Sequence, residues 1–430
     1  MVKTWAYIFV VSCLFPYVEI YNFGTDLQPT ALVSGFMLVV LTYLSRGGLS
    51  LSRVEWLFVL VTFFTFILML LELPNPLAIR GFVTYLSFTV VVIASKISLS
   101  YVVNLSKIVY VSSAIYIICG ILQIVVDPNL FVGIVPIERS AYGSGGRGVE
   151  SLTPEPTFLA FHLILLSLVS YQYGRKTYLE MIAVVFLSRS ASGAATLMPL
   201  LFSARHRRVA LVLSALIAVG LLASALTLAL QGGGRVERIA ALVANSDMES
   251  LLKDQSINDR LGSVVLSATS VFFDAGVPHG FVSWRNYVEH NDWYYSTFTY
   301  ISGFHGRIHS GIGAVLFECG VVGLVFLVAI FAQIRQLGFI TLSVAFLLLV
   351  QSTPLAQPVF AFIVAMGIFA KERRSSVALS SAAARTWSSE RRWFSPTGKD
   401  AGHQVSGRHP TFSALGAADK YDACTLPQGR

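Results

Sequence analysis

The sequence has few cysteines and few charged residues, and each shortage excludes a class of protein. Its 430 residues include four cysteines, which are scattered along the chain without paired spacing. We therefore expect neither a disulfide framework nor a zinc site. Charged residues make up 13% of the chain, whereas soluble domains average about 25%. The chain also has no long internal repeat, which weakens the case for a secondary transporter, since many such folds have repeated halves.

Apolar residues make up 55% of the chain and come in long blocks. A helix needs about 20 apolar residues to cross a hydrocarbon core of about 30 Å. We therefore predict an all-α, polytopic membrane protein. The first block, 5–21, has no small-residue cleavage site, so we expect a retained helix and not a removed signal.

The net charge of +8 is concentrated near the C-terminus. Residues 371–430 hold ten Lys and Arg against five Asp and Glu, a local charge of +5. This pattern favours a cytoplasmic end near anionic lipid, and not a nucleic-acid partner. The segment 375–430 is rich in Ser, Ala, Gly and Arg without a sustained period, so we predict a disordered tail.

Charges beside the apolar blocks predict the topology. Basic residues flank alternate connections in the first half of the chain, namely Arg46, Arg53, Lys96, Lys107, Arg175 and Lys176. The positive-inside rule then places the N-terminus in the cytoplasm and the loop 127–154 on the opposite side. The spans predicted up to this point are 5–21, 28–45, 54–73, 81–95, 108–126 and 155–173.

Two later blocks are predicted to fold as pairs of short helices. Block 178–202 has basic residues beyond both ends, so a single crossing would violate the positive-inside rule. It is broken at 188–193, and block 337–370 is broken at 352–358. Irregular backbone at membrane depth is tolerated where it is buried in protein or lines a wet cavity. The first break would put Arg189 at membrane depth on the same side as Glu155.

With further spans at 208–230 and 310–334, the count is about twelve, and both termini are cytoplasmic. Four regions follow. They are 1–230, with helices 1–9 and the loop 127–154; 231–309, a large polar loop; 310–370, with helices 10–12; and 371–430, the tail.

Charged residues predicted to lie on the outer face form the candidate site. Pro154 and Pro156 place Glu155 at the start of a helix. Arginine forks match phosphate oxygens and keep their charge near lipid, so Arg147, Arg189 and Arg260 would suit a diphosphate. Glu155 or His309 could accept a proton from a hydroxyl.

Other residues extend this candidate site. Aromatic rings suit the apolar faces of sugars, and the candidates are Trp284, Tyr287 and Trp293. Glu318, within an apolar helix, would pair with an arginine or extend toward the membrane surface. His305 and His309 have the spacing of helical metal ligands, but no third ligand motif accompanies them, so no metal is predicted.

Each candidate also has a purely structural interpretation. A carboxylate at position 155 is stabilised by the helix dipole whatever its function. Arg260 could pair with Asp254 or Asp259, and His162 is expected to pack between helices. The aromatic residues could belong to a membrane belt.

Four fragments resemble a known family, the integral-membrane O-antigen and exopolysaccharide polymerases, which are related to the O-antigen ligases. Arg147 followed by Glu155-Pro156-Thr157 is similar to their arginine and E-P-S/T at a helix start. Leu187 to Ser190 resembles their S-R-S/T step. Asp254 to Arg260 resembles the opening of their large loop. His309 with Glu318 to Leu324 resembles its closing histidine and the E-x-G-x-x-G-L that follows, although Ser310 stands where the family has Asn.

The resemblance implies a GT-C-like glycosyltransferase of the bacterial inner membrane. Its donor would be an undecaprenyl-pyrophosphate-linked glycan, and it would need no cofactor, metal or nucleotide sugar. The arginines would bind the pyrophosphate, and Glu155 or His309 would act as the base. The partners expected are this glycan, membrane lipids, a chain-length regulator and a flippase.

Three alternatives remain open at this point. A ligase of the same fold would transfer the glycan to lipid A–core. A polysaccharide transporter or flippase should place its charges near the bilayer midplane, whereas here they gather at one face. An assembly scaffold should tolerate alanine at Arg189 and Glu155.

Overall fold

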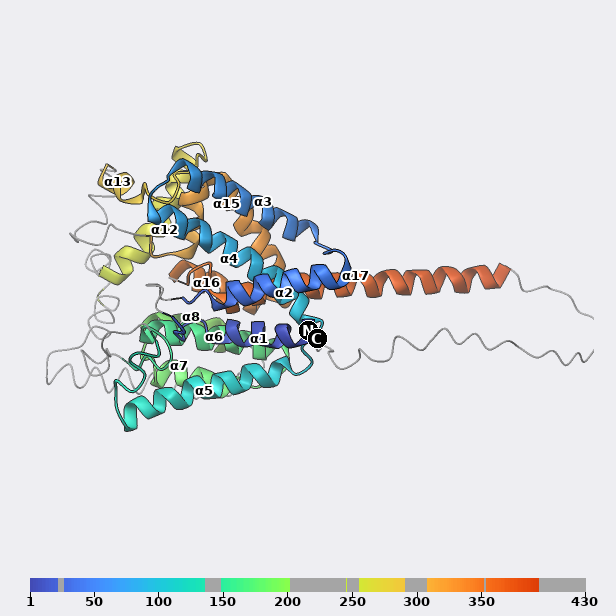
Figure 1. Cartoon of the computed structure of the whole chain (residues 1–430), viewed down its shortest axis with the longest axis horizontal. Helices are drawn as coiled ribbons and strands as arrows, with labels where there is room; N and C mark the ends of the chain where they lie inside the picture. Colours follow the sequence, from blue (N-terminus) through green and yellow to red (C-terminus); the bar gives the residue numbers. More distant parts are fainter. Residues whose placement is uncertain are drawn as a thin grey trace, which may run out of the picture.

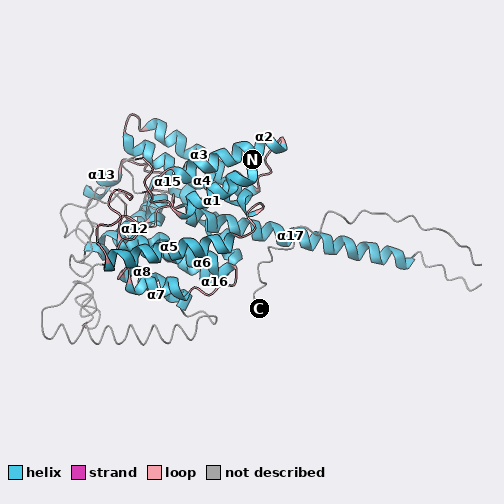
Figure 2. Cartoon of the chain, turned by 60° about the horizontal axis from the view of Figure 1, so that its bottom comes forward, coloured by secondary structure: helices cyan, strands magenta, loops and turns pink. Residues whose placement is uncertain are grey.

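The described part of the chain folds into helices and loops, with no strand (Figures 1 and 2). The structure, a computed structural model, describes residues 1–21, 27–135, 148–201, 245, 255–290, 308–351 and 353–393, with the backbone alone for 191, 255–261 and 377–393. The helices are α1 (Val2–Leu14), α2 (Thr30–Arg46), α3 (Arg53–Leu71), α4 (Pro76–Leu99), α5 (Leu105–Val125), α6 (Pro156–Gln172), α7 (Tyr178–Phe186), α8 (Ala191–Leu201), α12 (Gln255–Phe273), α13 (Trp284–Glu289), α15 (Gly311–Ile334), η2 (Arg335–Leu337), α16 (Phe339–Gln351) and α17 (Pro358–Trp393).

Membrane-length helices form the frame of the fold. Among the described helices, α3, α4, α5 and the continuous α15–η2 are long and apolar enough to cross a membrane. Shorter apolar helices pack around them, including α1, α2, α6 and α16. The prediction of an all-α protein with several membrane helices is confirmed. The predicted span 208–230 lies outside the described residues.

Local sequence signals start two of the long helices. Ser52 and Glu55 form a reciprocal capping box at the start of α3, in which each side chain accepts a hydrogen bond from the other residue's backbone N–H. Asn75 caps α4 by accepting a bond from Leu77 N–H, and Pro76 follows at the first helical position. The short turn 72–75 therefore reverses the chain between two neighbouring membrane helices.

Four phenylalanines join four helices in the interior. Phe58 of α3, Phe88 of α4 and Phe326 of α15 meet in pairs with ring centroids 5.3 to 5.4 Å apart, and Phe360 of α17 lies 6.4 Å from Phe88. All four side chains are fully buried. Because lipid tails are as apolar as these rings, the cluster holds the helices through close packing and not through exclusion of water.

The bundle has two distinct ends (Figure 1). The N-terminus of α1 lies at the end from which α17 projects, here called the α17 end. At the opposite end, here called the loop end, lie α12, α13 and the segments 148–155, 187–190, 274–283 and 308–310. The loop end carries most of the residues predicted to be functional.

Both interrupted blocks fold as predicted, into pairs of helices separated by a break. Residues 187–190 separate α7 from α8, and residues 352–357 separate α16 from α17. Helices α7 and α8 pack against each other and against α6. In the second break, Thr353, Leu355 and Gln357 are buried, and Gln357 donates hydrogen bonds to Tyr17 and His162. The irregular backbone of this break is therefore enclosed by protein.

His162 packs between helices, as its structural interpretation predicted. Its Nε2 lies 3.0 Å from the Leu14 carbonyl oxygen, which can only accept, so Nε2 carries the proton. Its Nδ1 is then free to accept from the Gln357 amide at 3.2 Å. The ring is fully buried and lies 4.5 Å from that of Tyr116. The histidine thus joins α1, α5 and α6 to the break before α17.

Two segments contain helix that the sequence analysis did not predict. The tail predicted to be disordered from 375 begins as helix, because α17 runs without interruption to Trp393. Its residues 371–393 contain no Gly or Pro and are rich in Ala, Arg and other residues compatible with a helix. Residues 394–430 lie outside the described part.

The second segment is 231–309, predicted to be a large polar loop between membrane spans. It contains α12, which packs along α15 and α16. Ser263, Ser267 and Ser270 are buried on one face of α12, and Gly313 of α15 lies against the first two. Small residues allow this close approach, so a segment of low hydrophobicity still packs against the bundle.

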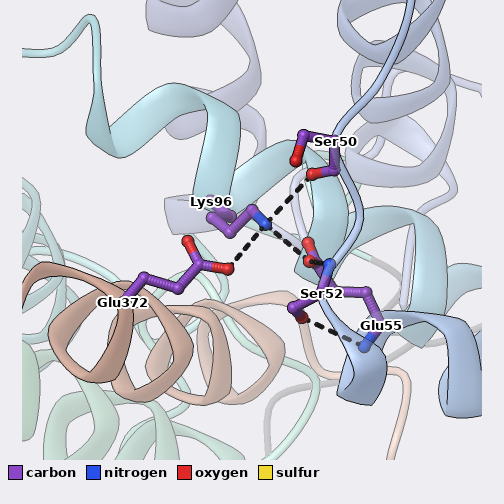
Figure 3. Close-up of polar contacts among 5 residues, drawn as sticks. All are labelled: Ser50, Ser52, Glu55, Lys96 and Glu372. Carbon is purple, nitrogen blue, oxygen red and sulfur yellow. Dashed lines mark hydrogen bonds and ion pairs between the residues drawn. The ribbon is translucent and has the colours of Figure 1, made fainter. Parts of the chain in front are cut away.

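A charge cluster joins three helices at the α17 end (Figure 3). Lys96 of α4 points at Glu55 of α3, with Nζ 2.5 Å from Oε2, and at Glu372 of α17, 3.2 Å from Oε1. The Glu55 side chain is fully buried, and that of Lys96 is 14% exposed. The cluster attaches the start of the projecting part of α17 to the bundle.

Candidate functional site at the loop end

The segment before α6 holds Glu155 in a fixed position. Ser151 donates its backbone N–H to Gln123 and its hydroxyl to the Tyr116 carbonyl, both at 2.6 Å. The Thr153 hydroxyl lies within hydrogen-bond distance of two carbonyl oxygens, those of Glu150 and Glu155. Glu155 is the N-cap residue of α6, and its side chain is exposed and makes no capping bond. The carboxylate is therefore presented at the loop end by a tightly bonded backbone.

The turn between α7 and α8 packs directly on this segment. Val149 N–H donates to the Leu187 carbonyl at 2.9 Å, and Gly148 lies against the backbone of Leu187 and Ser188. Gly193, at the start of α8, lies against Ala160 of α6. These contacts place Arg189 and Glu155 at the same end of the bundle, as predicted. Arg189 is exposed and has a positive φ of 47°, a conformation that is unfavourable for a residue with a side chain.

Alanine at Gly148 should disturb this contact. Its methyl group would overlap the carbonyls of Leu187 and Ser188, and backbone cannot move aside as a side chain can. We expect Gly148→Ala to lower the thermal unfolding temperature in detergent and to reduce activity. Gly48→Ala is the control, since no atom lies within 4 Å of its added methyl group. Equal unfolding temperatures for the two variants would contradict the described packing.

His309 lies just before α15, where the next residue, Ser310, bonds to α16. Helix α16 packs against both α8 and α12. Ser310 follows His309 and caps α15, because its hydroxyl oxygen accepts from Gly313 N–H at 3.1 Å and its proton is donated to the Leu349 carbonyl of α16. The half-buried His309 is thereby fixed at the start of α15. Serine at 310, where the resembled family has asparagine, thus has a structural role here.

Several predicted residues cannot be placed in the site. Arg147 and Trp293 lie outside the described residues, as does His305, and only the backbone of Arg260 is described, in the first half of α12. Trp284 was a candidate for stacking on a sugar, and the structure corrects this prediction. Its side chain is 6% exposed, and its ring packs edge-on against Phe317 with the ring centroids 4.9 Å apart. A ring covered in this way offers no face to a sugar.

Glu318 has a different partner from those predicted. Its Oε2 accepts a hydrogen bond of 2.7 Å from the Tyr85 hydroxyl of α4. The prediction of an arginine partner or an extended carboxylate is therefore corrected for the described part of the chain. Tyr85 also lies 6.2 Å from the ring of Phe281, which links Glu318 to a feature that the sequence analysis did not anticipate.

That feature is a break within α15, closed by a loop from 40 residues earlier. Gly320 has φ 56° and ψ −134°, so the helix is interrupted there. His279 and Gly280 donate their N–H groups to the carbonyls of Phe317 and Glu318, at 3.1 and 3.2 Å, and Gly276 accepts from Val321 N–H at 3.0 Å. The loop thus satisfies backbone groups that the helix leaves unpaired.

Two other helices hold the same loop. Both carboxylate oxygens of Glu72, at the end of α3, accept from Phe281 N–H at 3.0 Å. The Phe281 ring lies against Gly81 of α4, at a position that the Cβ of any other residue would occupy. The loop 274–283 is therefore fixed by α3, α4 and α15 together. The arrangement uses three glycines of positive φ, at 276 and 280 in the loop and at 320 in α15.

A polar group lies on this fixed loop. Asp274 Oδ2 accepts from the Tyr287 hydroxyl at 2.6 Å and lies 3.1 Å from His279 Nε2. The His279 ring stacks on Phe317 at 4.6 Å. Partial burial, together with the bond to Asp274, raises the pKa of Tyr287 well above its usual value, so the hydroxyl keeps its proton.

Comparison with family models, with curated proteins and with solved structures found no match. The class of the protein therefore rests on its own features, which in the described part of the chain are an apolar helical bundle with Glu155, Arg189 and His309 at the loop end. Among the described residues, no three His, Cys, Asp or Glu side chains lie close enough together to hold a metal ion. A cation and a carboxylate on rigid, adjacent segments can bind an anionic group and accept a proton.

Proposed function

We propose that the chain is a membrane glycosyltransferase that joins lipid-diphosphate-linked oligosaccharide repeats into a polysaccharide. The observation that carries the proposal is the packing of the Arg189 turn on the Glu155 segment at the loop end. Two of the fragments that resemble the polymerase family are thereby adjacent, although Glu155 and Ser188 lie 33 positions apart in the chain. Their meeting on an apolar helical bundle fits an enzyme that acts on lipid-linked substrates.

The proposed orientation places the loop end outside the cytoplasm, in the periplasm of a bacterial inner membrane. Arg46, Arg53, Lys96 and Lys371 flank helices at the α17 end, and the positive-inside rule assigns that end to the cytoplasm. About twelve spans and a GT-C-like arrangement belong to this proposal. In it, the pairs α7–α8 and α16–α17 each leave from and return to the cytoplasmic side.

The chemistry required of the protein is limited. The acceptor hydroxyl oxygen bonds to the anomeric carbon as the bond from that carbon to the diphosphate oxygen breaks, and the lipid diphosphate leaves with the electron pair. Arg189, with Arg147 and Arg260, would neutralise the diphosphate. Glu155 or His309 would take the hydroxyl proton. The acceptor is a second lipid-linked repeat, and a chain-length regulator and a flippase would act alongside.

The test is a reaction in vitro with purified full-length protein in liposomes. A lipid-pyrophosphate-linked repeat unit is supplied alone, and the products are separated on a gel. We expect a ladder of polymers without added lipid A–core. Transfer of glycan only after lipid A–core is added would identify a ligase instead, and no reaction in either case would favour transport or a scaffold.

A further inference from the structure

Asp274 and His279 of the loop 274–283 and Tyr287 of α13 form a polar group in which both side-chain donors bond to one carboxylate oxygen. The Tyr287 hydroxyl proton goes to Asp274 Oδ2, 2.6 Å away. His279 Nε2 lies 3.1 Å from the same oxygen, and a carboxylate can only accept, so Nε2 also donates to it. Both donors in the group are therefore used on a single oxygen atom.

Three acceptors remain. Asp274 Oδ1 and His279 Nδ1 make no hydrogen bond to any described residue, and neither is among the buried polar atoms of the described part that lack a partner. They are therefore open to the surroundings, in agreement with side-chain exposures of 35% for Asp274 and 18% for His279. The Tyr287 oxygen also keeps its lone pairs. With a neutral His279 ring the group presents acceptors alone, so a ligand that satisfies it must bring hydrogen-bond donors.

The group is rigid. The His279 ring is stacked on Phe317 at an interplanar angle of 13° and meets the Tyr287 ring at 4.7 Å. The loop beneath it is bonded to the break in α15. Acceptors that are already fixed in place lose little conformational entropy on binding, which favours affinity.

The surrounding charge supports a neutral polyol over an anion. The carboxylate of Glu72, at the end of α3, lies against the loop and accepts from Phe281 N–H. Arg285 of α13, two residues before Tyr287, is exposed and paired with Glu289 at 2.9 Å. A diphosphate would be repelled here, and a metal ion would find too few ligands.

We infer that Asp274, His279 and Tyr287 form a sugar subsite that binds hydroxyl groups of the glycan, apart from the residues proposed to bind its diphosphate. The inference rests on the proposed function for the identity of the sugar chain. The subsite holds part of the repeat while Arg189 holds the lipid diphosphate. It provides binding and does not take part in bond making.

Binding of a free oligosaccharide tests the subsite without turnover. The probe is the oligosaccharide released by mild acid from the lipid-linked repeat, titrated into full-length protein by calorimetry. We expect Asp274→Asn to raise Kd about tenfold or more, because hydrogen bonds to charged acceptors are among the stronger ones. In the ladder assay, KM for the repeat should rise with kcat unchanged, the signature of lost uniform binding.

Two variants at His279 keep the test valid if the asparagine variant misfolds. Glutamine can donate to Asp274 and still present an oxygen, so His279→Gln should bind within about threefold of wild type. His279→Leu fills the space without an acceptor and should bind about tenfold more weakly. Glu289→Gln is the matched control, since it makes the same change from carboxylate to amide on the neighbouring helix.

The outcomes separate the two proposals. Unchanged Kd in both Asp274→Asn and His279→Leu would overturn the subsite, even if the ladder forms. Oligosaccharide binding that these variants weaken, in a protein that makes no ladder, would support the subsite and overturn the polymerase. A wild type that does not bind the oligosaccharide at all would overturn the subsite.

Discussion

Replacing Arg189 with glycine should stop polymer formation while leaving the protein as well folded as before. The guanidinium is proposed to neutralise the leaving diphosphate, and loss of one such donor typically costs a factor of 10² to 10³ in rate. The effect of the same substitution on the backbone should be stabilising. At φ 47° a residue with a side chain is disfavoured by roughly 1 to 2 kcal/mol, and glycine is not. The measurement is the initial rate of ladder growth beside the unfolding temperature of the same preparation.

Two comparisons make the result specific. Arg189→Lys keeps the charge but loses the planar fork, so its rate should be intermediate. Arg285→Ala removes another exposed arginine of the loop end and should retain the wild-type rate. A glycine variant that makes a normal ladder would exclude Arg189 from diphosphate binding. A variant that loses both stability and activity would indicate a structural role.

Replacing Lys96 with methionine should give the largest loss of stability. Methionine keeps the length of the side chain but leaves the fully buried Glu55 carboxylate without its cation. Breaking a buried ion pair on one side typically costs about 3 to 5 kcal/mol. Helix α17 also loses its ion pair to α4 at this end (Figure 3). We expect a clear fall in unfolding temperature and faster proteolysis between residues 371 and 393.

The double variant Lys96→Met with Glu55→Gln should recover much of that loss. Glutamine removes the unpaired charge and can still accept from Ser52 N–H through its amide oxygen. Glu372→Gln should cost about 1 kcal/mol or less, because the Glu372 side chain is 45% exposed. If the double variant is no more stable than Lys96→Met, the buried charge is not the cause of the loss.

The sequence predicts the breaks between helices better than the break within one. Charges at both ends of 178–202 and the prolines in 352–358 indicated interruptions, and α7–α8 and α16–α17 contain them. Both signals are local, since proline and topology act on the residues beside them. The meeting of Arg189 and Glu155 followed from the same topological argument.

The break at Gly320 could not be predicted in this way. A glycine in an apolar helix is typical of close helix packing, and nothing beside it indicates φ 56°. The bonds that stabilise the break come from Gly276, His279 and Gly280, about 40 residues earlier. Long-range backbone pairing of this kind leaves no periodic pattern. For the same reason, the group around Asp274 and the burial of Trp284 became apparent only in the structure.

Helix α17 extends well beyond the helices that it packs against. It is continuous from inside the bundle to Trp393. Arg374 is the last described side chain bonded to another helix, and the helical residues 375–393 beyond it span about 28 Å. A continuous helix of this length keeps its two ends at a fixed separation. The helix therefore sets the distance between Trp393 and the charge cluster at Lys96.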